Sequence, residues 1–198
     1  MIQPSFWLLF AMNMYCIYYY QQHPEAFKTI VWIYWIQSVL IGLFNFVYLL
    51  TLKNVVPGSW GIQRGEGKTV QQTPLQSAIF FLLHYGVFHL VYMIFLFAMV
   101  KEGSVDMLFI LISAAAFSLS LVVDFIRKKI QEQTSAVDVN IAFFLPYVRI
   151  IPMHLMFFVP VFLGWKMSSA FLVLKTIADI AMYVLTNYIE QQKNPVSK

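Results

Sequence analysis

The sequence predicts an all-α integral membrane protein, a bundle of about six transmembrane helices in a single domain that covers residues 1–198. Of its residues, 60% are hydrophobic and only 11% are charged, whereas about a quarter of the residues of a soluble domain are charged. So few charges cannot cover a water-facing surface. The apolar residues form continuous runs, most of them longer than the ~20 residues that cross a hydrocarbon core, without the strict alternation of a membrane β-barrel.

Six apolar segments are expected to span the membrane, although the first is only marginally long enough. Thr73, followed by a proline and then by Gln76, predicts the start of the third segment through a capping box. The fifth segment contains three prolines, so we expect a kinked helix whose freed carbonyls bond to neighbouring helices. The spans are Ser5–Tyr20, Thr29–Leu52, Pro74–Val100, Ser104–Ile126, Asn140–Gly164 and Ser168–Ile189.

The distribution of lysine and arginine predicts that both termini lie in the cytoplasm. With six spans, the termini share a side with the polar stretches at residues 53–74 and 127–139, which we expect to be loops. Cytoplasmic loops are richer in basic residues, and that side carries more of them. They are Lys53, Arg64, Lys68, Arg127, Lys128, Lys129, Lys193 and Lys198, against Lys28, Lys101 and Lys166 on the other side.

The same charge pattern bears on partners. The net charge of +4 comes from basic residues in short loops rather than on one hydrophilic face, so no nucleic acid is expected to bind. The lipid bilayer is the expected partner. A stripe of small residues between Ser113 and Ser120 is typical of close helix packing and also suits a subunit of a larger membrane complex.

A single cysteine, Cys16, excludes a disulfide framework within the chain.

Ionisable side chains at membrane depth predict a polar site, because they are costly in hydrocarbon. At 1.5 Å per residue along each span, these side chains and two amides fall into two layers. The lower layer holds His84, Arg149, Asp179 and Asn45, and the upper layer holds His89, His154, Lys175 and Gln37. A buried arginine needs a counter-charge, and Asp179 is the best-placed carboxylate for Arg149.

The histidines are candidate ligands of a transition metal or of haem. His84 and His89 are five residues apart, which separates them by about 140° on a helix, so they cannot chelate one metal as an i, i+4 pair would. His89 and His154, from different helices at one depth, form the better pair. We expect His84, His89 and His154 to bind the metal, with Arg149 and Asp179 as a supporting pair.

Two other roles of these residues stay open. The histidines can act only as hydrogen bonds between helices, or they can line a path for protons or a substrate. The sequence therefore allows a membrane protein with an intramembrane polar site, a transporter or channel subunit, or a structural and assembly protein. No reaction is predicted.

Three groups of residues resemble an uncharacterised family of bacterial multi-spanning membrane proteins, a domain of unknown function. They are Tyr34-Trp35-Ile36-Gln37 with Gly42 and Asn45, His84-Tyr85-Gly86 with His89, and Pro146-Tyr147 with Arg149-Ile150 and Met153-His154. The family often has an acidic residue where Gln37 stands. The resemblance covers most of the chain and implies location in the bacterial cytoplasmic membrane, but no activity.

A long loop that leads into a helix with two histidines at this spacing also resembles the rhomboid proteases. The chain has no GxSG serine motif, and no catalytic serine–histidine pair can be assigned from the sequence. The resemblance therefore implies an inactive rhomboid-like fold.

Overall fold

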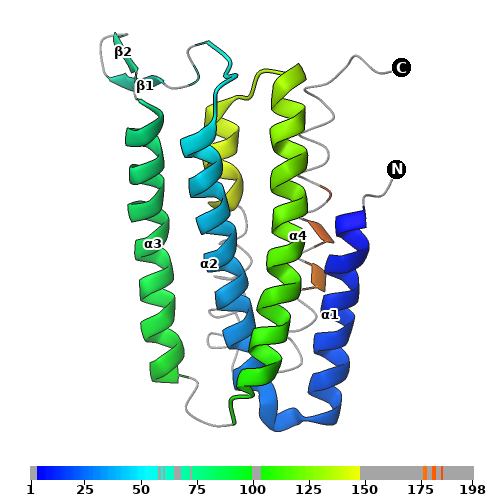
Figure 1. Ribbon diagram of the computed structural model, residues 1–198. Helices are drawn as coiled ribbons and strands as arrows, with labels where there is room; N and C mark the ends of the chain where they lie inside the picture. The colour runs from blue at the N-terminus through cyan, green and yellow to red at the C-terminus, as the bar shows by residue number, and fades with distance from the viewer. Residues whose placement is uncertain are drawn as a thin grey trace. The chain divides into compact units, whose positions relative to one another are not determined.

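Three long apolar helices, α2 (Phe27–Thr51), α3 (Pro74–Met99) and α4 (Met107–Thr134), run in alternating directions (Figure 1). They belong to a central unit, Glu25–Pro146; Met1–Pro24 and Tyr147–Lys198 form a second, terminal unit. The computed structural model describes residues 4–57, 59, 61–64, 68–71, 73–99, 104–147, 176, 177, 180, 181 and 184. Within these residues, the same three helices are long and apolar enough to cross a membrane, as expected of an integral membrane protein.

The remaining expected spans are described only in part. The first corresponds to α1 (Pro4–Gln22) of the terminal unit, and a short 3₁₀ helix, η1 (Pro24–Ala26), follows it in sequence. Residues 139–147 are helical at the start of the fifth span, and residues 176, 177, 180, 181 and 184 are helical in the sixth. The total of six spans and the proline kink stay predictions, because most of the fifth and sixth spans lies outside the described residues.

Helix α4 is longer than the sequence predicted. The expected span ended at Ile126 before a polar loop, but the helix continues to Thr134, so the predicted loop at residues 127–139 was wrong in its first half. Arg, Lys, Glu and Gln are strong helix formers, and no glycine or proline interrupts them. At its start, Asp106 caps the helix by accepting a hydrogen bond from Phe109 N at 2.9 Å.

The stretch between α2 and α3 contains a β-hairpin where only a loop was expected. Strands β1 (Gly61–Arg64) and β2 (Lys68–Gln71) pair antiparallel, with Gly61 opposite Gln71. Two strands of four residues give too short an alternation to stand out in the sequence. The glycines of the intervening Gly65-Glu66-Gly67 are nevertheless typical of a short hairpin connection.

The predicted capping box at the start of α3 is confirmed. Gln76 N donates to Thr73 Oγ1 at 3.2 Å, and Thr73 N donates to Gln76 Oε1 at 3.0 Å. This reciprocal pair satisfies two backbone donors that an uncapped helix end would leave without a partner.

Helices α2 and α4 run parallel and are joined at both ends. At their starts, Thr29 Oγ1 donates to Ser104 O at 3.1 Å and accepts from Asp106 N at 2.9 Å. This single hydroxyl therefore fixes the chain that enters α4 against the first turn of α2.

At the other end, the buried carboxylate of Glu132 holds the chain that leaves α2. Glu132 Oε1 accepts from the backbone nitrogens of Lys53 and Asn54, and Oε2 pairs with Lys129 Nζ. Lys129 Nζ also donates to Thr51 O at 2.7 Å, and Asn54 Nδ2 donates to Glu132 O at 2.8 Å. The residue is only 4% exposed, so these contacts replace its hydration.

Replacing Glu132 with alanine is expected to destabilise the central unit by about 2 kcal/mol, because two backbone donors and Lys129 lose a charged acceptor. Thermal unfolding in detergent measures the effect. Gln133→Ala, an exposed position in the same turn of α4, is the matched control. Equal unfolding midpoints for the two variants would contradict a holding role for Glu132.

Candidate functional site

A stripe of small and polar residues on α2 faces α3. Ser38, Gly42 and Asn45 recur at helical spacing and are buried, as are Tyr85 and His89 of α3. The spacing of i, i+4 and i+7 places the three α2 residues on one side of the helix. Contacts between Ser38 and both α3 residues show that this side meets α3.

Ser38, Tyr85 and His89 form a buried hydrogen-bond network. His89 Nε2 lies 2.7 Å from Ser38 Oγ, and His89 Nδ1 lies 2.9 Å from the backbone oxygen of Tyr85. Tyr85 Oη donates to Ser38 O at 3.0 Å and lies 3.1 Å from Ser38 Oγ. Trp35 Nε1 adds a bond to the backbone oxygen of His89 at 2.9 Å. Four polar contacts of hydrogen-bond length therefore link α2 to α3.

The partners determine which nitrogen of the neutral His89 ring carries the proton. A backbone carbonyl can only accept, so Nδ1 must donate to Tyr85 O. Nε2 of the neutral ring then accepts, and the hydroxyl of Ser38 donates to it. Tyr85 Oη–H is directed to the carbonyl of Ser38. Every donor of the network has an acceptor, as buried polar groups require.

Gly42 makes the close approach of the two helices possible. A Cβ atom at this position would lie 2.7 Å from Tyr85 Cδ1 and still nearer to Cε1. The ring of Tyr85 therefore occupies the space that any larger residue would need. On its other side the ring stacks on His89, with centroids 4.2 Å apart and planes 25° apart.

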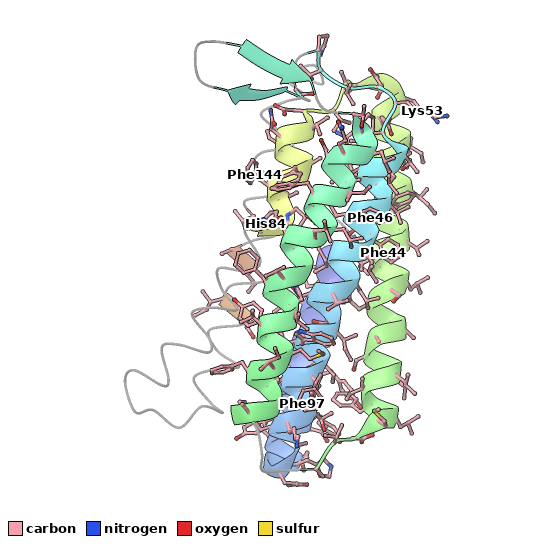
Figure 2. The ribbon with its side chains drawn as sticks, turned by 90° about the vertical axis from the view of Figure 1, so that its left-hand side faces the viewer. Phe44, Phe46, Lys53, His84, Phe97 and Phe144 are labelled. Carbon is pink, nitrogen blue, oxygen red and sulfur yellow. The ribbon has the colours of Figure 1, made fainter. Side chains whose placement is uncertain are left out.

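The two histidines of α3 lie in different surroundings, on sides of the helix about 140° apart. His89 belongs to the network, whereas His84 is exposed and projects from the side of α3 away from α2 (Figure 2). The ring of His84 stacks on Phe80 at 5.5 Å and meets Phe88 edge-on at 5.3 Å. The structure does not bring His84 and His89 together.

Gln37 and Asn45 of the predicted layers lie on α2 and are buried. Four other residues of the predicted site lie outside the described part of the chain: Arg149, His154, Lys175 and Asp179. The metal ligands His84, His89 and His154 and the supporting pair of Arg149 with Asp179 therefore stay predictions. Among the residues that the structure does describe, no group of three histidine, cysteine or acidic side chains could hold a metal ion.

Ser38 and Tyr85 are the members of the network that the sequence did not assign. Ser38 precedes Gly42 by four residues and Asn45 by seven, and this stripe of small and polar residues was the available signal. The structure also supplies a serine–histidine pair, Ser38 with His89. Both side chains are buried, so the pair is a bond between helices and not a nucleophile open to substrate.

Asn45 continues the polar stripe beyond Gly42. It is 9% exposed, and its Nδ2 makes no hydrogen bond within the described residues; the same holds for Ser113 Oγ on α4. A buried donor without a partner is uncommon in proteins. The Asn45 amide is therefore the polar atom on this side of α2 that is best placed to meet a further polar group.

Replacing Gly42 with alanine is expected to destabilise the protein by about 1–3 kcal/mol, since the Tyr85 ring must move away from Ser38. Gly86→Ala is the matched control on α3, because a Cβ there meets nothing within 4 Å. Helix propensity alone should make that control neutral or slightly stabilising. Unfolding in detergent measures both, and a Gly42→Ala protein as stable as the control would rule out the close contact.

Comparison with known proteins places the chain in a family without assigning an activity. No match is found among curated proteins or among solved structures. The model of a family of unknown function matches residues 1–195, which include every residue of the network. The chain belongs to this family, the family of unknown function DUF6498.

Proposed function

We propose that the protein is a transporter or channel subunit of the bacterial cytoplasmic membrane in which the Ser38–Tyr85–His89 network binds and passes on a proton. The observation that carries the proposal is the 2.7 Å contact between His89 Nε2 and Ser38 Oγ. Histidine is the side chain whose charge ordinarily changes between pH 5 and 8. Histidines inside membrane helices are typical of proton relays.

The network can satisfy its hydrogen bonds in both protonation states of His89. When the ring takes up a proton, Nε2–H donates to Ser38 Oγ, and the Ser38 hydroxyl turns to donate to Tyr85 Oη at 3.1 Å. Tyr85 Oη–H keeps its bond to Ser38 O at 3.0 Å. Hydroxyl groups both donate and accept, so the heavy atoms need not move.

A protonated His89 would need a counter-charge from outside the α2–α3 pair. Helix α3 contains no charged residue, and α2 contains only Lys28 at its start. Two tyrosines of α3 have rings near His89. One is Tyr85, and the other is Tyr92, whose ring centroid lies 6.3 Å from that of His89. The candidate for this counter-charge is Asp179, the acidic residue that the sequence predicts at membrane depth. The Nδ2 group of Asn45, which makes no hydrogen bond to any residue that the structure describes, suits a polar path that continues along α2.

A second candidate function is the binding of a metal or haem by His84, His89 and His154. Both ring nitrogens of His89 already lie within hydrogen-bond distance of protein oxygens, so a metal at Nε2 would have to displace Ser38 Oγ. Elemental analysis and an absorption spectrum of the purified protein test this alternative. A stoichiometric metal or a Soret band would favour it over proton binding.

We also infer that the connections after α2 and after α4 face the cytoplasm, which places both termini there for six spans. The support is the basic composition of these two connections. Cysteine labelling of the hairpin in sealed inverted vesicles measures the orientation.

His89→Gln is expected to abolish proton flux into proteoliposomes driven by a pH gradient, because the amide cannot take up a proton. His84→Gln, which removes the other histidine of α3 without touching the network, should retain most of the flux. Difference infrared spectra should show one histidine taking up a proton while the hydrogen bonding of a tyrosine hydroxyl changes, and this signal should disappear in His89→Gln and change in Tyr85→Phe.

Two results would contradict this function. One is wild-type flux no higher than that of empty liposomes. The other is a His89→Gln protein that folds normally and conducts as well as His84→Gln.

A further inference from the structure

We propose that the amide of Asn45 binds an ordered water molecule, which extends the path of the proton from the Ser38–Tyr85–His89 network toward the end of α2. The path rests on the proposed function, because the water is the next group of the same path. The water site itself has a test that does not depend on proton flux. Its support is the burial of Asn45, its position on α2 and the apolar surface that α3 presents at its level.

The amide of Asn45 is a buried donor that needs an acceptor. Asn45 is only 9% exposed, and its Nδ2 makes no hydrogen bond within the part of the chain that the structure describes. A buried donor without an acceptor costs more free energy than a typical hydrogen bond contributes. Ordered water is a common partner of buried polar groups that protein atoms leave unsatisfied. The amide therefore marks a place where a water molecule would be held.

Asn45 lies on the same side of α2 as the network. It follows Ser38 by seven residues, which are about two turns and 10.5 Å of helix, and it follows Gly42 by three. The Cα–Cβ bond of a helical residue tilts toward the start of the helix. That of Asn45 thus tilts toward Gly42, where the ring of Tyr85 lies. Tyr85 Oη, bonded to Ser38 O at 3.0 Å, already covers part of the rise between Ser38 and Asn45, and one water with two bonds of about 2.8 Å can cover the rest.

Helix α3 offers apolar surface at the level of Asn45. The two helices run in opposite directions (Figure 1), so the turn of α3 before Tyr85 lies beside the turn of α2 after Gly42. This turn of α3 contains Phe81, which is fully buried and stacks on Tyr85 with centroids 5.0 Å apart. The face of a phenyl ring accepts an N–H group only weakly. A water molecule is the stronger acceptor for Nδ2.

The water gives the network a group to which it can pass its proton. For this step the Tyr85 hydroxyl turns from Ser38 O to the water. His89 Nε2 then gives its proton to Ser38 Oγ, Ser38 Oγ gives its own to Tyr85 Oη, and Tyr85 Oη gives its own to the water. Each hydroxyl oxygen gains one O–H bond and loses one, and His89 is neutral again. The amide of Asn45 has both a donor and an acceptor, so it can hold the water before and after the transfer.

Infrared difference spectra of the purified full chain, recorded in ordinary water and in water labelled with heavy oxygen, test the site. A water held by the amide gives an O–H band that the heavy oxygen shifts. We expect this band in the wild-type protein and in Asn45→Ser, which keeps a side-chain donor, and no such band in Asn45→Leu. Ser113→Ala is the matched control and should keep the band. It removes the other buried side-chain atom that has no hydrogen bond within the described residues, on α4 instead of α2.

Stability and flux separate this role from a structural one. Asn45→Leu should unfold in detergent at no lower temperature than the wild-type protein, because the amide has no bond to a described residue to lose. Its proton flux should nevertheless fall about tenfold, the equivalent of one hydrogen bond, whereas Asn45→Ser and Ser113→Ala should conduct normally. Asn45→Ala, which adds no volume, gives the same reading if leucine does not fit.

The outcomes distinguish the water site from the proposed function. A wild-type protein without the band, or a band that persists in Asn45→Leu and Asn45→Ala, would overturn the water site and leave the amide against the ring of Phe81. Flux through a folded Asn45→Leu protein equal to that of Ser113→Ala would overturn its part in the path. A band that depends on Asn45 in a protein that does not conduct would contradict the proposed function and support the water site.

Discussion

The contact of the Tyr85 ring with Gly42 is the constraint on which the described site depends. Within a bilayer, apolar side chains gain little by leaving lipid for another helix, so close packing and polar bonds between helices decide which helices pair. The absent side chain of Gly42 admits the ring, and the ring carries its hydroxyl to Ser38. His89, one turn further along α3, then reaches the same serine. Without the space at Gly42, neither Tyr85 nor His89 would be positioned to bond to Ser38.

The parts of the fold that could be predicted from the sequence are those with local causes. Long apolar runs defined α2 and α3 to within a few residues, and the capping box at Thr73 defined the start of α3. The end of α4 was missed because polarity marks the edge of the hydrocarbon and not the end of a helix. Its last turns also depend on Glu132, whose partners at Lys53 and Asn54 are distant in sequence. The short hairpin gave no periodic signal of useful length.

The candidate site could be predicted only in outline, for a related reason. The period of the helix was enough to separate His84, which is exposed, from His89, which bonds to Ser38 of α2. The identity of its partner requires the register of α2 against α3, which no local pattern contains. Ser38 was therefore missed, although it lies on the same stripe as Gly42 and Asn45. The residues predicted to complete the site, Arg149, His154 and Asp179, lie outside the described part of the chain.

The most direct test of the account is a double-mutant cycle between Ser38 and His89, measured as unfolding free energies of Ser38→Ala, His89→Phe and the double variant. Because the Ser38 hydroxyl donates to His89 Nε2 at 2.7 Å, the effects of the two substitutions should not add. The account predicts a favourable coupling of about 0.6 kcal/mol or more, the average for hydrogen bonds between membrane helices. Additive effects of the two substitutions, with no coupling, would contradict it.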